Sequence, residues 1–102
     1  MERPLTAYRF VQEIAALPFV DAIWLFGSRA RGYARARSDI DLAVLCPRAD
    51  IRDWSRIMEI VEEEADTLLE IDCVRLDELP EGSEFRAAIE RTHQVLFERA
   101  PA

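Results

Sequence analysis

The chain has 102 residues, of which 50% are hydrophobic, and a formal net charge of -7. This length predicts a single compact domain over residues 1–102, and the negative charge argues against a broad electrostatic grip on nucleic acid or on an anionic membrane. Because no apolar run approaches the ~20 residues that cross a bilayer and the first ten residues lack the apolar core of a signal peptide, we expect a cytoplasmic protein.

The first half of the chain predicts helices and strands in alternation. Apolar residues at helical spacing predict a first helix over 10–17. The apolar run 22–26 predicts a buried strand, and Gly27 breaks it before a short helix that begins at Ser28. A polar loop then leads to a second predicted strand over 40–45.

The second half continues the same alternation. An apolar stripe over 54–68 predicts a long helix with Asp50 as its N-cap. A third strand is predicted over 71–74, a short helix over 83–90 and an edge strand over 95–97. The order αβαβαβα(β) predicts an α+β fold with a single small mixed sheet flanked by helices.

The segment FGSRARGYARARSDIDLAV, residues 26–44, combines a Gly-Ser turn with four arginines and two closely spaced aspartates. Gly27 permits a close approach to the backbone, and Ser28 begins a helix whose free N–H groups favour phosphate. Because all thirteen basic residues of the chain are arginines, phosphate would be held by arginine, backbone N–H groups or a metal. The arginines nearest this turn are Arg29 and Arg31, which makes them candidate nucleotide-binding residues together with the turn itself.

Two aspartates lie at the start of the second predicted strand, and ten residues separate the first of them from the Gly-Ser turn. Asp39 and Asp41 lie on either side of Ile40, so in a strand they share one face with Cβ atoms about 6 to 7 Å apart. Carboxylates this close repel one another, and a divalent cation between them removes the repulsion. Asp72 would join them if the third strand lies beside the second. Together they predict a Mg²⁺-dependent site for nucleotidyl or phosphoryl transfer.

Each of these residues also has a purely structural alternative. A Gly-Ser pair alone is an ordinary turn and helix cap, and the paired aspartates could simply begin an exposed strand. Asp72 alternatively pairs with Arg75 or faces solvent. For the arginines, including Arg35 and Arg37, the alternative is a solvated loop face. We expect structural roles for His93, the only histidine, and for the two cysteines, which should be free thiols.

The segment FGSRARGYARARSDIDLAVL, followed by IDCVRLDELP, resembles the minimal nucleotidyltransferases of the DNA-polymerase-β-like superfamily. The resemblance covers nearly the whole chain and implies a nucleotidyltransferase fold. It implies that Gly27 and Ser28 hold the triphosphate of ATP. It also implies that Asp39 and Asp41 bind two Mg²⁺ ions, with Asp72 as the third catalytic carboxylate and metal ligand.

The resemblance further implies a partner. Small members of this family are commonly encoded beside a HEPN-domain ribonuclease toxin and act as its antitoxin, some by transferring AMP from ATP to a tyrosine near the toxin's active site. This implies a protein adenylyltransferase that forms a hetero-oligomer with the toxin and does not itself bind nucleic acid. Two alternatives stay open: an antitoxin that acts by contact alone, and the nucleotide-binding subunit of a small-molecule adenylyltransferase.

One segment departs from the family's pattern. Near the C-terminus, RTHQVLFE takes the place of a more usual Arg-Glu-Gly segment. His93 therefore stands where a glycine is common. The departure leaves the role of this turn open and does not touch the acidic positions.

Overall fold

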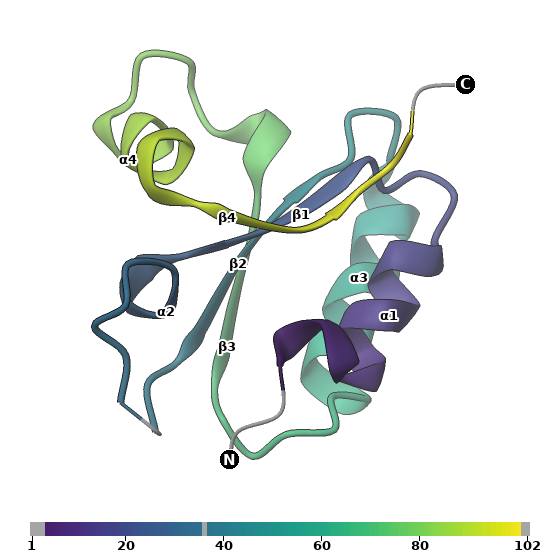
Figure 1. Cartoon of the computed structure of the whole chain (residues 1–102). Coiled ribbons are helices and arrows are strands. Elements are labelled where there is room, and N and C mark those ends of the chain that lie inside the picture. The colour runs from purple at the N-terminus through teal and green to yellow at the C-terminus, as the bar shows by residue number, and fades with distance from the viewer. Residues whose placement is uncertain (1–3, 36, 101–102) are drawn as a thin grey trace.

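The computed structural model describes residues 4–35 and 37–100. Four strands form one sheet in the order β3-β2-β1-β4 (Figure 1). The strands are β1 (Ala22–Phe26), β2 (Ile40–Leu45), β3 (Ile71–Arg75) and β4 (Gln94–Glu98). β1 pairs antiparallel with β2 and with β4, whereas β3 runs parallel to β2. The sheet is therefore mixed, which confirms the predicted α+β fold.

Helices flank this sheet on both sides (Figure 1). They are α1 (Arg9–Ala16), α2 (Gly27–Ala30), α3 (Ile51–Glu63) and α4 (Glu84–Thr92), with the 3-10 turns η1 (Leu5–Ala7) and η2 (Leu76–Glu78). The predicted N-cap of α3 is confirmed, because the Asp50 carboxylate accepts from the Asp53 N–H at 2.8 Å and the Asp53 carboxylate accepts from the Asp50 N–H at 3.0 Å. None of the described helices is long and apolar enough to span a bilayer.

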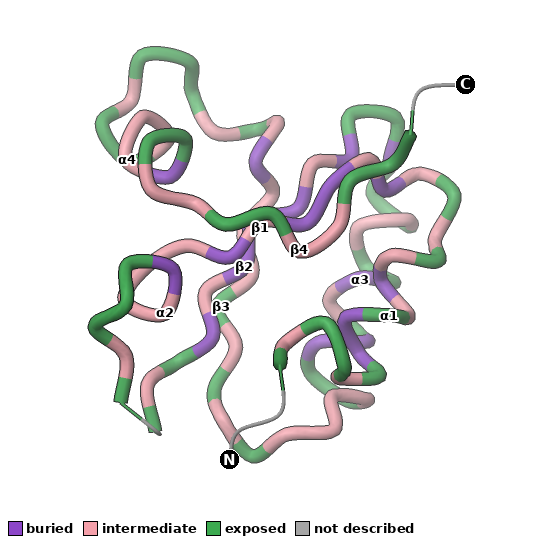
Figure 2. Tube along the Cα trace, viewed as in Figure 1, coloured by how far each residue is buried: buried purple, intermediate pink, exposed green. Residues whose placement is uncertain are grey.

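The main hydrophobic core lies between one face of the sheet and the pair of helices α1 and α3 (Figure 2). Alternate residues of β2 enter it because successive side chains of a strand point to opposite faces: Ile40, Leu42 and Val44. Phe10 and Ile14 of α1 have no exposed surface, as their helical spacing predicts. This core fixes which side chains of β2 are left for the other face.

A smaller cluster occupies part of the second face, below α4. It consists of Ala43, Leu76 and Ile89, with Trp24 and Phe26 packed against it. α4 thus covers only one end of this face. Asp41 lies at the remaining end of β2, and Asp39 directly precedes the strand.

The helix α3 is shorter than the apolar stripe predicts. It ends at Glu63, and Leu68, the last residue of the stripe, is fully exposed. Asp66 explains the difference, because its carboxylate accepts from the backbone N–H groups of Arg9 and Phe10 at 3.0 and 3.1 Å. These groups belong to the first turn of α1 and have no partner within that helix. The chain therefore leaves the helical path to satisfy the start of another helix.

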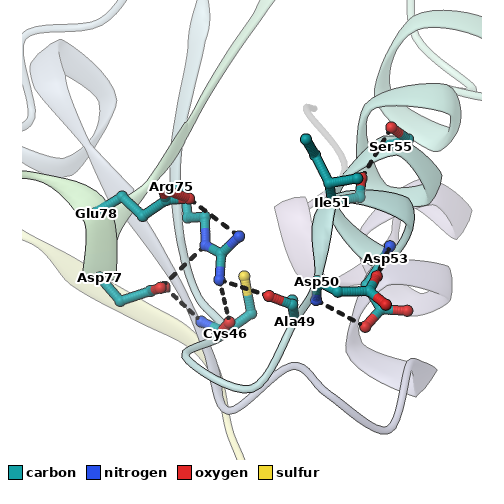
Figure 3. Close-up of polar contacts among 9 residues, drawn as sticks. All are labelled: Cys46, Ala49, Asp50, Ile51, Asp53, Ser55, Arg75, Asp77 and Glu78. Atoms are coloured by element: carbon teal, nitrogen blue, oxygen red, sulfur yellow. Dashed lines mark hydrogen bonds and ion pairs between the residues drawn. The ribbon is translucent and has the colours of Figure 1, made fainter.

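Arg75, at the end of β3, ties this strand to the loop that follows β2 (Figure 3). Its guanidinium donates to the Asp77 carboxylate at 2.9 Å and to the carbonyls of Cys46 and Ala49 at 3.0 and 2.9 Å. Glu78 lies 3.0 Å from the same guanidinium. The Asp77 carboxylate also accepts from the Cys46 N–H at 2.9 Å. This network joins the ends of the two parallel strands.

The two cysteines are free thiols, as predicted. Burial, followed by the charge of Asp77, raises the pKa of Cys46 to about 11. Burial raises the pKa of Cys73 to about 12. Since the thiolate is the reactive form, we expect alkylation at pH 8 to be at least about a hundredfold slower in the folded protein than in the unfolded chain. Mass spectrometry after timed exposure to iodoacetamide, with and without urea, measures this ratio. Similar labelling rates in both states would contradict it.

Candidate functional site

On the second face of the sheet, a row of acidic residues lies next to the small core. Asp39 and Asp41 of the β2 segment share this face because they are two residues apart. Pairing with β1 sets Phe26 directly opposite Asp41, and pairing with β3 sets Asp72 beside it. The row therefore lies where β1 passes into α2 (Figure 1). The candidate site is defined as Gly27, Ser28, Asp39, Asp41 and Asp72.

The three carboxylates share one electrostatic environment. Burial of Asp41 is the largest cause that raises its pKa, followed by the charges of Asp72 and Asp39 and by a hydrogen bond with the Asp72 side chain. The positive charge of Arg29 acts in the opposite direction. Negative charge at Asp41 is therefore disfavoured unless a cation is near.

The alternative pairing of Asp72 with Arg75 is wrong. The two residues are three positions apart in β3, so their side chains leave opposite faces of the sheet. The ion pairs of Arg75 are with Asp77 and Glu78. The exposed Asp72 lies instead beside Asp41.

The acidic row fits a divalent cation chemically. Carboxylate oxygens are the ligands that Mg²⁺ prefers, and the raised pKa of Asp41 shows a carboxylate whose charged form a cation would stabilise. Within residues 4–35 and 37–100, however, no three acidic, histidine or cysteine side chains are arranged as a ready metal-binding group. Asp39, Asp41 and Asp72 are thus suitable donors that do not form a rigid cage on their own.

Gly27 fits tightly against this row. Its backbone is in the left-handed region, with φ at +75°, which favours glycine. A Cβ at this position would collide with Oδ2 of Asp41 and lie 3.1 Å from its Cγ. The absence of a side chain therefore lets the first turn of α2, which includes Ser28, lie directly beside the carboxylate.

Arg29 joins α2 to the segment that carries the acidic residues. Its Nη2 and Nε donate to the Ser38 carbonyl at 2.7 and 3.1 Å, and Nε also lies 3.3 Å from the Asp39 carbonyl. The guanidinium thus fixes the backbone just before β2. Its predicted contact with a nucleotide stays a prediction.

The other arginines lie on the loop that follows α2. Arg31 is exposed, with its guanidinium carbon 5.4 Å from the centre of the Tyr33 ring. Arg35 and Arg37 are exposed as well, and the Arg35 N–H donates to the Ser38 hydroxyl at 2.8 Å. Nucleotide binding by Arg31 also stays a prediction.

His93 has the structural role that we expect for it. Its ring stacks on Trp24, with ring centres 3.7 Å apart and planes 14° from parallel. Nδ1 lies 3.1 and 2.9 Å from the carbonyls of Ile89 and Glu90, so this nitrogen carries the proton and closes the last turn of α4. The segment that departs from the family's pattern therefore caps a helix at this position.

The structure contains a groove beside Asp39 that the sequence does not predict. It has a volume of about 520 Å³ and is lined by Arg37, Asp39, Leu68, Leu69 and Glu70. Its apolar wall includes the exposed Leu68, which helical periodicity assigns to a buried stripe. Only the early end of α3 brings this residue to the groove, and the local pattern carries no signal for that end.

Comparisons with known proteins identify similar folds. Residues 11–102 match the family described as "Polymerase beta, Nucleotidyltransferase". The curated proteins contain no match to the chain. Among solved structures, the chain is similar to a toxin-antitoxin with AMP-PNP, at 22% identity over 88% of this chain and 72% of that chain, with a TM-score of 0.62.

Two further structures share the fold. A mutant of the toxin-antitoxin MntA-HpeT is 19% identical over 89% of this chain and 69% of that chain, with a TM-score of 0.58. A Sulfolobus solfataricus protein assigned to the nucleotidyltransferases is 19% identical over 88% of this chain and 75% of that chain, with a TM-score of 0.55. At these sequence identities the similarity shows a shared fold and nothing further.

Proposed function

The chain belongs to the polymerase beta nucleotidyltransferase family, and on this premise we propose that it is an ATP-dependent protein adenylyltransferase acting as an antitoxin. The proposed reaction transfers AMP from ATP to a tyrosine hydroxyl of a HEPN-domain ribonuclease toxin and releases pyrophosphate. The observation that carries the proposal is the row of three carboxylates beside the Gly27–Ser28 turn. The likeness to toxin-antitoxin structures, one of them with AMP-PNP, supports the choice of partner and nucleotide.

Each residue of the proposed site has a physical task. Asp39, Asp41 and Asp72 would hold two Mg²⁺ ions, which supply the positive charge that nucleotidyl transfer requires. The Gly27–Ser28 turn, which lies against Asp41, would hold the triphosphate close to these carboxylates. Asp72, which is exposed as Asp39 is, would accept a proton from the incoming hydroxyl. A tyrosine hydroxyl has a pKa of about 10 and needs this help at neutral pH.

The groove beside Asp39 is the proposed entrance for the acceptor. Leu68 and Leu69 give it an apolar wall, which suits the ring of a tyrosine side chain. The acidic end of the groove belongs to the candidate site. A ring packed along the leucines would therefore point its hydroxyl towards the carboxylates.

The charge of the chain suits the proposed partner. A ribonuclease binds a polyanion and so needs a basic surface. The present chain has a formal net charge of -7, with exposed acidic residues along α3: Glu59, Glu62 and Glu63. Opposite charges on the two proteins would speed their association and cover the RNA-binding surface.

Intact-mass analysis of a co-expressed HEPN-domain partner tests the proposal. We expect the partner to gain mass in units of AMP only with ATP, Mg²⁺ and the wild-type chain, and to stay inactive as a ribonuclease after the chain is removed. An Asp41→Asn protein is the matched control and should leave the partner unmodified. A partner that stays unmodified and recovers its ribonuclease activity on separation would establish neutralisation by contact alone. A partner without ribonuclease activity, together with AMP transfer to a small hydroxyl compound, would establish the small-molecule alternative.

A further inference from the structure

Phe85, in the first turn of α4, is an aromatic residue left half exposed near the candidate site. The exposed fraction of its side chain is 48%, whereas Ile89 of the same helix is 2% exposed. The Phe85 ring contacts Phe26 edge to face, with ring centres 5.7 Å apart and planes at 78°. Single exposed apolar residues are common on proteins, so exposure alone does not mark this ring as a binding site, and its position must be considered.

Phe26 connects this ring to the acidic row. It is the last residue of β1, directly opposite Asp41 in the sheet, and is followed by Gly27. Residues directly opposite one another in antiparallel strands project from the same face, so Phe26 and Asp41 are neighbours on the second face. Across this face, Asp72, Asp41 and Phe26 follow one another, and Phe85 packs on the last of them.

The site described above accounts for the phosphates and for the acceptor, but not for the base of a nucleotide. We propose that Phe85, supported by Phe26, is the platform on which the base of the bound nucleotide stacks. This inference rests on the proposed function, since it requires a nucleoside triphosphate at the acidic row. Aromatic rings bind nucleobases through their faces, and no hydrogen-bond partner on the protein is needed for this contact. The ribose would bridge the distance from the phosphates at Gly27 to the base at Phe85.

A second exposed aromatic ring allows a matched control. Tyr33 has an exposed fraction of 73% and lies on the loop that follows α2. Its ring is already in contact with the Arg31 guanidinium. The inference assigns base stacking to Phe85 and none to Tyr33, so alanine at the two positions should have different effects.

Calorimetric titration with two ligands tests the platform. In the presence of Mg²⁺, we expect Phe85→Ala to weaken ATP binding about tenfold and to leave the affinity for inorganic tripolyphosphate unchanged, because tripolyphosphate has no base. Phe85→Tyr should bind ATP as the wild-type protein does, and Tyr33→Ala should bind both ligands normally. In a Phe85→Trp protein, ATP should quench the fluorescence of the new indole and tripolyphosphate should not.

The outcomes separate this inference from the proposed function. If the wild-type protein binds neither ligand, the proposed function and the platform are both overturned. If the wild-type protein binds ATP and Phe85→Ala binds it equally well, only the platform is overturned. If Phe85→Ala weakens the binding of ATP and of tripolyphosphate equally, the platform is also overturned, because the substitution would then act through the Gly27–Ser28 turn. A Phe85→Ala protein that binds ATP normally but no longer binds the toxin would overturn the platform and assign Phe85 to the partner interface instead.

Discussion

An Asp72→Asn protein is expected to keep most of its affinity for ATP and to transfer AMP about a hundredfold to a thousandfold more slowly than the wild-type protein. The reason lies in the position of Asp72, an exposed residue of the acidic row that pairs beside Asp41. The substitution removes one negative charge and leaves Asp39 and Asp41, the other two proposed metal ligands, in place. The expected loss corresponds to about 3 to 4 kcal/mol of transition-state stabilisation.

Single-turnover transfer, measured together with thermal melts, tests this expectation. Asp21→Asn is the matched control, because Asp21 forms an exposed ion pair with Arg48 at 2.8 Å far from the row. It should change stability by less than about 1 kcal/mol and leave transfer unchanged. Asp41→Asn should weaken nucleotide binding as well as transfer. An Asp72→Asn protein that transfers at the wild-type rate would remove Asp72 from the active site.

Replacing Gly27 by alanine is expected to reduce transfer by at least about a hundredfold and to lower the free energy of unfolding by about 2 to 3 kcal/mol. Part of the loss is the left-handed backbone at φ +75°, which costs a residue with a side chain about 1 to 2 kcal/mol. The remainder comes from the collision of the new Cβ with Oδ2 of Asp41. To relieve the collision, either the carboxylate or the turn must move away from the position that it has in the proposed site.

Gly32 offers a control for the backbone contribution alone. Its φ is +80°, close to that of Gly27, but a Cβ there would meet no atom within 4 Å. Gly32→Ala should therefore lower the free energy of unfolding by about 1 kcal/mol and leave transfer near the wild-type rate. Urea denaturation and single-turnover transfer on both variants make the comparison. Equal losses of transfer in the two would show that the contact between Gly27 and Asp41 is unimportant.

The sequence predicts the strands of this fold better than the end of its longest helix. β1 and β2 lie where their apolar runs place them, because glycine and proline close those runs locally. Helical periodicity predicts that α3 continues to Leu68, whereas the helix ends at Glu63. This end depends on Asp66, whose carboxylate caps α1 more than fifty residues earlier, and helical periodicity contains no information about that contact.

The candidate site divides in the same way. The common face of Asp39 and Asp41 follows from their spacing of two, so the sequence alone predicts it. The place of Asp72 depends on which strands pair, so the sequence predicts it only on the condition that β3 lies beside β2. The contacts of Arg29 with the backbone before β2, and the groove that includes Leu68, arise from the tertiary arrangement. No local sequence pattern predicts these contacts or this groove.

The alternation along β2 links folding to chemistry. One face of this strand passes from Asp41 to Ala43 of the small core, while the other face carries the buried Ile40 and Leu42. A slip of one residue against β1 would bury the aspartates and expose the large apolar side chains, and no compact state tolerates both. The protein therefore cannot stay folded with β2 in a shifted register that would displace the acidic row. For this strand, insertions and deletions of a single residue should be recovered as unfolded chains, and folded but inactive ones should not occur.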